Sequence, residues 1–322
     1  MRIVEKHVFL DNKQNRKIGK RRMQMLEFNN TWKDIYRLET PLSGVWNGII
    51  FVDGKEKVLI DSGLDAQNVD ECLVPALKQL GYELTDVDWL LCTHCHGDHV
   101  GGHKRIVELG NVKAAVYKES VPKLHDPLKY SKLIRAAFPE HSPAAPAVLE
   151  GVKETRIIED GEIIAGRLQL IATPGHDDDC VCFYDLETKT LITGDSLQGN
   201  GTASQGTALY MSLPDYRNSL AKLKAMDIQN IISGHPYLFS GDKAIGKEEA
   251  LKYLERCEEI VAVYDAFIRE RLAEGETEIA AIAEQLITYM KNIKPEYLFL
   301  AMYTVKTHME EIIKNKERGR QS

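Results

Sequence analysis

The sequence lacks the features that mark several special classes of protein. No stretch approaches the ~18 uninterrupted apolar residues of a membrane-spanning helix. The first residues contain neither an apolar segment nor a small-residue cleavage site, so we expect no secretory signal. The six cysteines form no C-x-x-C pair and lie mostly within apolar runs, which predicts reduced core residues rather than disulfides. We therefore expect a cytoplasmic protein without membrane contact.

An excess of positive charge is also missing. The net charge of −7 gives no support to a general nucleic-acid-binding protein, although it does not exclude local basic patches. Hydrophobic residues make up 43% of the chain and charged residues 28%, which are the values of an ordinary globular protein. The length of 322 residues permits two domains, or one large core with an appendage.

What the sequence does contain is a dense group of histidines directly after an apolar run. Residues 90–93 read as a short buried strand. Three histidines and an aspartate follow within six positions, namely His94, His96, Asp98 and His99. The first two histidines alternate by two and are expected on one side, while Gly97 lets the chain turn before the second pair. Imidazoles combined with a carboxylate suit a divalent metal such as Zn, Mn or Fe.

An apolar strand, a glycine and then a side chain able to bind metal recur three more times downstream. These side chains are His176, Asp195 and His235, each directly after a glycine. Glycine frees the backbone to turn at the end of a strand, so the side chain can point off the edge of the sheet. Four such strands would bring seven ligands to one edge, which is too many for one tetrahedral ion and suits two.

The motif His94-Cys95-His96-Gly97-Asp98-His99, with the downstream Gly–ligand pairs, resembles the motif set of the metallo-β-lactamase superfamily. Asp61, in the segment Leu59-Ile60-Asp61-Ser62-Gly63, is similar to the acidic end of an upstream strand in that family. The resemblance implies an α/β fold for residues 32–242, a four-layer αββα sandwich with a two-metal site at one edge of the paired sheets.

The resemblance also implies a role for each ligand. His94, His96 and His176 would hold one metal ion, Asp98, His99 and His235 would hold the other, and Asp195 would bridge them. Asp61 would orient a ligand imidazole, with capping of a turn as the alternative. Asp98 would also be the catalytic residue that orients the attacking hydroxide. The cofactors would be two divalent ions, with zinc preferred and iron or manganese as alternatives.

Two residues outside the motifs are candidates for contact with a substrate. Residues 118–150 are rich in proline, and in the family this region tends to cover the metal site. His141 lies in this segment and is the first candidate, and Tyr210 is the second. Cys95 stands between two predicted ligands, but strand alternation should point it away from them.

We divide the chain into an N-terminal extension (1–31), a metallo-β-lactamase domain (32–242) and a C-terminal helical subdomain (243–322). Apolar residues at helical spacing predict three helices in the last part. These helices would form either a cap docked on the sandwich or a winged-helix-like subdomain, similar to the tail of certain ribonucleases of the superfamily. The apolar stripe of the last helix would serve a core or a homodimer interface.

The predicted activity is hydrolysis of a small ester, thioester or lactone by a hydroxide held between the two metal ions. The alternative is a metal-dependent nuclease whose C-terminal helices dock nucleic acid. The negative net charge and the run Asp177-Asp178-Asp179 beside His176 weigh against the nuclease.

Overall fold

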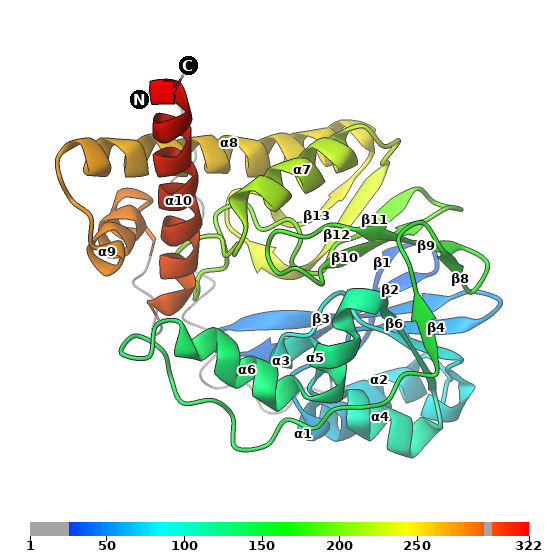
Figure 1. Ribbon diagram of the computed structural model, residues 1–322. Helices are drawn as coiled ribbons and strands as arrows, with labels where there is room; N and C mark the ends of the chain where they lie inside the picture. Colours follow the sequence, from blue (N-terminus) through cyan, green and yellow to red (C-terminus); the bar gives the residue numbers. More distant parts are fainter. Residues whose placement is uncertain (1–25, 293–297, 322) are drawn as a thin grey trace.

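Two β-sheets face each other in the computed structural model, which describes residues 26–292 and 298–321 (Figure 1). Within these residues the first sheet has seven strands in the order β1-β2-β3-β4-β5-β6-β7, and the second has six in the order β13-β12-β11-β10-β9-β8. The strands of the first sheet are β1 (Asn29–Trp32), β2 (Ile35–Leu42), β3 (Val45–Asp53), β4 (Lys57–Ile60), β5 (Trp89–Leu91), β6 (Lys113–Tyr117) and β7 (Arg156–Ile158). Those of the second are β8 (Ile163–Ile164), β9 (Leu168–Ala172), β10 (Val181–Asp185), β11 (Thr190–Ile192), β12 (Asn230–Tyr237) and β13 (Gly241–Ile245).

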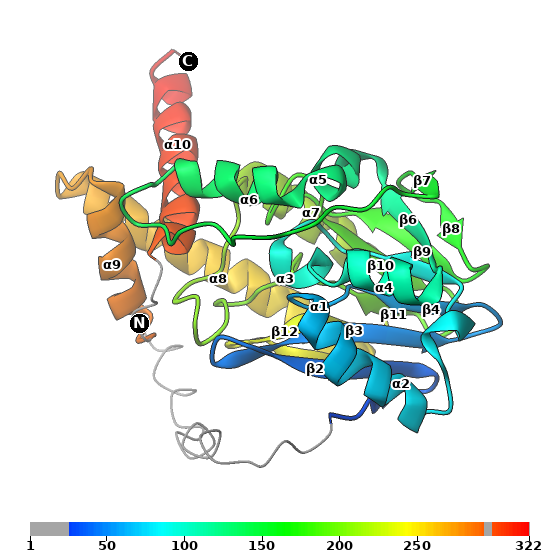
Figure 2. The same cartoon turned by 90° about the horizontal axis from the view of Figure 1, so that it is seen from below.

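Helices cover the outer face of each sheet, as the two views in Figures 1 and 2 show. Those over the first sheet are α1 (Ala66–Asn68), α2 (Val74–Gln79) and α4 (His103–Gly110), with a π-helical turn at Val69–Leu73 between the first two. The short helices α3 (Gly97–Val100), α5 (Val121–His125) and α6 (Pro127–Ala136) follow strands β5 and β6. The helices on the side of the second sheet are α7 (Leu213–Lys224), α8 (Lys247–Ala273), α9 (Ile279–Tyr289) and α10 (Phe299–Gln321).

Apolar side chains fill the spaces between these layers. Between the two sheets, Val52 and Leu91 pack in one cluster with Phe183. A separate cluster on the outer face of the first sheet joins Phe51 to Leu73 of the π-helical turn. Burial of apolar surface between the sheets and under the outer helices is the main source of stability for a layered fold.

The C-terminal helices share a single core with the outer face of the second sheet. Ile231 of β12 belongs to the same buried cluster as Tyr216 of α7, Tyr264 of α8 and Val305 of α10. The apolar stripe of the last helix is therefore buried within the chain, so it serves the core and is not available for a dimer interface.

This architecture confirms the predicted αββα sandwich with a C-terminal helical part, while the division into domains stays a prediction. Strand β1 begins at Asn29, inside the predicted extension, and β13 runs across the predicted boundary at residues 242/243. Residues 1–25 of the extension lie outside the described residues. The described residues after β13 contain helices and no strand, which favours the docked cap over a winged-helix subdomain.

The direction of the strands decides where the functional side chains meet. Strand β10 pairs antiparallel with both β9 and β11, and β11 pairs parallel with β12. Strands β9, β11 and β12 therefore run in the same direction and end at the same edge of the second sheet. In the described part of the chain, no helix is both long and apolar enough to cross a membrane.

Candidate metal centre

The chain that follows strand β5 carries four of the seven predicted ligands. His94 comes three residues after the strand, and His96 occupies the N-cap position of α3 with extended backbone angles. Asp98 and His99 lie in the single turn of α3. The strand does not continue through the histidines as the alternation argument assumed, because the chain turns into α3 and the turn brings the second pair beside the first.

The other three ligands come from the second sheet. His176 follows β9 after Gly175, which has a φ angle of +145°, and Asp195 follows β11 after Gly194, which has a φ angle of +47°. Both angles lie in the region that favours glycine, as predicted for turns at strand ends. His235 differs from this prediction, because β12 continues through it to residue 237.

The structure brings all seven side chains together in two groups of three with Asp195 between them. The first ligand group is His94, His96 and His176, the second is Asp98, His99 and His235, and the ligand atoms of each group lie within 4.8 Å of one another. Asp195 faces both groups: its Oδ1 lies 3.3 Å from His99 Nε2 and its Oδ2 lies 3.7 Å from His176 Nε2. One carboxylate therefore presents a different oxygen to each group.

Hydrogen bonds fix the orientation of three ligand imidazoles. Each uses Nδ1 toward an oxygen of the protein: His99 toward Asp61 Oδ2 at 2.8 Å, His235 toward Trp46 O at 2.8 Å, and His176 toward Leu209 O at 2.7 Å. Backbone carbonyls and ionised carboxylates can only accept hydrogen bonds. We therefore assign the proton to Nδ1 in all three rings. The Nε2 atoms then keep their lone pairs and face the interior of the ligand cluster.

Asp61 accepts several hydrogen bonds at the end of β4. Its carboxylate accepts from Thr93 N at 2.8 Å and from Thr93 Oγ1 at 2.9 Å, in addition to the contact with His99. The residue has a φ angle of +65°, which aspartate tolerates better than most residues. Asp61 thus lies where a residue that orients a ligand imidazole is expected.

The donor set fits divalent metal ions. His99 Nε2 and His235 Nε2 are 3.2 Å apart, and His96 Nδ1 lies 3.0 Å from His176 Nε2. Two imidazole nitrogens at this separation repel each other unless a proton or a metal cation lies between them. His94 Nε2 and Asp195 Oδ1 are buried without a hydrogen-bond partner among the described residues. Unpaired polar atoms are costly to bury, and coordination to a cation would satisfy them.

The protonation states also suit coordination. Burial lowers the pKa of His176 to about 4, and burial with the neighbouring His99 and His96 lowers the pKa of His94 well below its ordinary value. Burial alone would raise the pKa of Asp195, but His235 and His99 hold it well below its usual range. His94 and His176 are therefore neutral imidazoles and Asp195 is an ionised carboxylate, the forms that bind metal. Burial would lower the pKa of His99 and His235, but Asp195 and Asp98 raise it in the metal-free chain, so these two rings must lose a proton when a metal ion binds.

A network around Asp177 supports the first ligand group, and the sequence did not reveal it. Asp177 Oδ2 lies 3.3 Å from His96 Nε2 and also accepts from the hydroxyl of Tyr130, whose ring stacks on His96 at an interplanar angle of 15°. Lys123 Nζ donates to Asp177 Oδ1 at 2.7 Å and to Asp179 Oδ1 at 2.8 Å. Lys123 thus compensates the acidic run, which therefore weighs less against a nuclease than the sequence alone indicates.

The signal for this network was the position of Asp177 directly after a ligand histidine. Its partners Lys123 and Tyr130 come from α5 and α6, in the proline-rich segment that was expected to cover the site. Burial alone would lower the pKa of Lys123, but Asp179 and Asp177 raise it above its usual range. The lysine is therefore charged, and it binds the carboxylates as a cation.

The two substrate-contact candidates and Cys95 lie in different surroundings. His141 is exposed on the segment after α6. Tyr210 is completely buried, and its hydroxyl lies 2.8 Å from His308 Nε2, so the structure does not support its contact with a substrate. Cys95 points away from the ligand histidines, as expected, and its Sγ donates to Ser120 O. Burial raises the pKa of this thiol well above its usual value.

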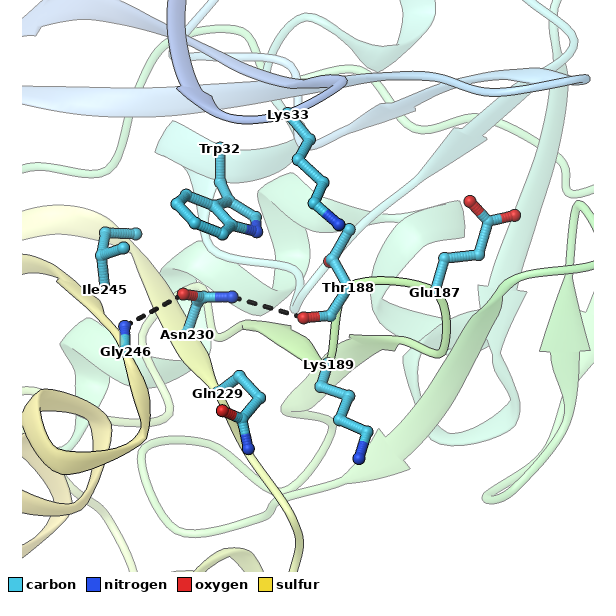
Figure 3. A pocket seen from close by; sticks show the side chains of 9 residues that line it. All are labelled: Trp32, Lys33, Glu187, Thr188, Lys189, Gln229, Asn230, Ile245 and Gly246. Carbon is cyan, nitrogen blue, oxygen red and sulfur yellow. Dashed lines mark hydrogen bonds between the residues drawn. The ribbon is translucent and has the colours of Figure 1, made fainter.

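A separate open pocket lies at the other ends of the same strands (Figure 3). Its walls include Trp32, Thr188, Lys189, Asn230 and Gly246. Asn230 accepts from Gly246 N at 3.1 Å and donates to Thr188 O at 3.3 Å, so its amide links two sides of the pocket wall. Strands β11 and β12 begin here and end at the ligand cluster, so this pocket is not part of the candidate metal centre.

Comparisons with known proteins agree with this arrangement. The model of the metallo-beta-lactamase superfamily matches residues 44–235, which is more than half of the chain. The beta-lactamase-like protein 2 homolog of Caenorhabditis elegans is 30% identical over 224 residues, covering 67% of this chain and 64% of that protein. An atrochrysone carboxyl ACP thioesterase of Aspergillus fumigatus is 24% identical over 242 residues, covering 75% of this chain and 66% of that protein. The chain thus spans about half to two thirds of the curated relatives that it matches.

Solved structures share the fold. A metallo-beta-lactamase family protein from Thermus thermophilus superposes with a TM-score of 0.67 at 21% identity, covering 88% of this chain and 94% of that one. A subclass B3 metallo-beta-lactamase of Bradyrhizobium japonicum gives a TM-score of 0.56 at 19% identity, covering 78% and 97% of the two chains. The matched family model, the two facing sheets and the seven side chains at their edge agree, and this chain belongs to the metallo-beta-lactamase superfamily.

Proposed function

We propose that the chain is a hydrolase that binds two divalent metal ions and cleaves a thioester of a small acyl group. The observation that carries the proposal is the pair of ligand groups on either side of Asp195, each with two imidazole nitrogens facing each other about 3 Å apart. Imidazole with carboxylate favours zinc, with iron or manganese as alternatives. When bound, such ions supply Lewis acidity and lower the pKa of coordinated water toward about 7.

Asp98 is the residue that we assign to the proton of the attacking water. Its side chain is 24% exposed, whereas that of Asp195 is 5% exposed, so Asp98 is the cluster carboxylate that solvent can reach. Burial would raise the pKa of Asp98, but His99 and His235 hold it well below its usual range, which keeps the carboxylate ionised. Asn47 Nδ2 donates to the backbone oxygen of Asp98 at 2.8 Å and steadies the turn.

Hydrolysis of a thioester needs water as its only co-reactant. The water oxygen adds to the carbonyl carbon, Asp98 accepts the proton, and the carbon–sulfur bond then breaks to release a thiolate and a carboxylic acid. The proton on Asp98 passes to the thiolate, which leaves as a thiol and returns Asp98 to its ionised form. The Nδ1 partners of His99, His235 and His176 keep the ligand rings still while charge develops on the carbonyl oxygen. A thiolate leaves readily, so this substrate class does not require a separate general acid.

The choice of a thioester among small acyl substrates follows from the relatives. Several of them are named acyl-carrier-protein thioesterases, although each is only 24–25% identical to this chain. The net charge of −7 also favours a small acyl substrate over a nucleic acid.

The test is a comparison of substrate classes on one zinc-loaded preparation. We expect acyl thioesters to be hydrolysed, and we expect Asp98→Ala to lower that rate by roughly 10²- to 10⁴-fold, as for loss of a proton acceptor. Asp70→Ala, which removes a carboxylate on the outer helical layer, should leave the rate unchanged. Lactones and single-stranded RNA complete the panel. Cleavage of RNA that disappears in Asp98→Ala, without thioester turnover, would replace this proposal by the nuclease.

A further inference from the structure

A threonine of the C-terminal helix α10 binds the backbone next to a predicted ligand. Thr304 is completely buried, and its hydroxyl donates to Ala208 O at 2.7 Å and accepts from Tyr210 N at 3.2 Å. Both partners lie in the segment 196–212 that connects β11 to α7. One side chain of α10 thus holds the residues on either side of Leu209.

Leu209 is the residue that orients His176. Its carbonyl accepts from His176 Nδ1 at 2.7 Å, and its N–H donates to Gln198 Oε1 at 2.7 Å. Gln198 is also buried, and its Nε2 lies 2.8 Å from the same His176 nitrogen. Since both nitrogens carry protons when His176 donates to Leu209 O, the amide of Gln198 packs against the ring without a hydrogen bond to it. The position of the Leu209 carbonyl therefore sets the direction in which His176 Nε2 points.

The C-terminal helices hold this backbone at further points. Tyr264 of α8 accepts from Ala208 N at 3.0 Å, and His308 of α10 contacts the Tyr210 hydroxyl at 2.8 Å. Residues 208–210 are thus fixed from α8 and α10 by side chains that are all buried. The segment has no strand or helix of its own, so its conformation depends on these contacts.

We propose that Thr304 is a positioning residue for the metal centre, which acts on His176 through the carbonyl of Leu209. The C-terminal helices are then a structural part of the first ligand group as well as a cover for the second sheet. This inference rests on the proposed function, because it takes His176 to be a metal ligand. It extends that proposal by giving the helical part a defined contact with the site.

The substitution that tests it is Thr304→Val, which keeps the shape of the side chain and removes both hydrogen bonds. We expect zinc affinity, measured by competition with a chromophoric chelator, to fall about tenfold, the lower end of the effect of losing an indirect partner of a metal ligand. Thr304→Ser keeps the hydroxyl and should restore the affinity. The absorption spectrum of the cobalt-loaded protein should change in Thr304→Val and report the altered position of His176.

Thr307→Val is the matched control on the next turn of α10. Thr307 is buried, and its hydroxyl accepts from Leu213 N at 2.9 Å, at the start of α7 and away from Leu209. Thr307→Val should lower the Tm of the metal-free protein as Thr304→Val does, and it should leave zinc affinity and the cobalt spectrum unchanged. If Thr304→Val does not fold, Thr304→Ala removes the same hydroxyl without filling its place.

Two outcomes would overturn different claims. Equal zinc affinities for Thr304→Val and Thr307→Val would contradict the positioning role of Thr304. His176→Ala is the benchmark for the metal site itself. If that variant binds zinc as tightly as the unchanged protein, the proposed ligand set is wrong, whatever Thr304 does.

Discussion

The two ligand groups use similar side chains but are held in place by different parts of the fold. Partners of the second group come from the first sheet: Asp61 at the end of β4 orients His99, and the Trp46 carbonyl in β3 orients His235. Partners of the first group come from segments without regular structure, including Leu209 and Asp177. A hydrogen-bonded sheet holds its residues without help, whereas loops depend on whatever packs against them. The first group should therefore be the more sensitive to distant changes.

The largest difference between the groups is expected on substitution of Asp61. Asparagine has one carboxamide oxygen, so Asp61→Asn cannot keep both the bond that Thr93 N donates to Oδ1 and the bond that His99 Nδ1 donates to Oδ2, although it tolerates the φ angle of +65°. We expect one zinc-binding step to lose about 10- to 100-fold in affinity and the other to change less. A two-step chelator titration measures both. Equal loss in both steps would show that the groups do not behave as separate sites.

A smaller effect is expected for Asp177, which supports the first ligand group. Asp177→Asn should weaken one zinc-binding step by about tenfold, since the contact with His96 Nε2 is longer at 3.3 Å. Asp178→Asn is the matched control, because this neighbouring side chain is 82% exposed and also bonds to Lys123. The same titration distinguishes the two variants. A similar loss in both would indicate that local charge, and not contact with His96, is responsible.

The smallest effect is expected at the basic end of α10. Lys314 and Lys316 are exposed, so the double change to glutamate should alter thioester hydrolysis and zinc affinity by less than about twofold, as is usual for surface substitutions. In contrast, Thr304→Val, at the other end of this helix, should lower zinc affinity about tenfold. A large loss of RNA binding in the double variant, with RNA as a substrate of the unchanged protein, would revive the nucleic-acid alternative.

Much of the sandwich could be predicted because each of its signals is local. Apolar runs that end in a glycine predicted β9 and β11 directly, and helical spacing predicted α8 and α10. Leu73, Leu77 and Leu80 are spaced as on one face of a helix and predict a helix over residues 68–80. It exists as α1, a π-helical turn and α2, beginning two residues earlier at Ala66, where Asp65 caps it. Strand β1 was missed, since four residues with polar neighbours carry too little periodicity to detect.

Support for the site was harder to predict than the ligands themselves. The seven ligands follow strand ends, but Lys123 lies 54 residues from Asp177, and α10 lies more than 90 residues from the segment that it holds. Tyr210 illustrates the same limit. A tyrosine in a loop suggests contact with a substrate, and only the folded chain reveals that His308 and the helical core surround it.

Gly194 is a position at which this sequence should tolerate no substitution during evolution. A Cβ atom at this position would lie 2.3 Å from Thr93 Oγ1, and Thr93 is the residue that bonds to Asp61 behind His99. Even alanine, the smallest side chain that could replace the glycine, would displace Thr93 and, through Asp61, the ligand His99. Gly194 carries no ligand atom, and yet selection should treat it as strictly as the residues that do.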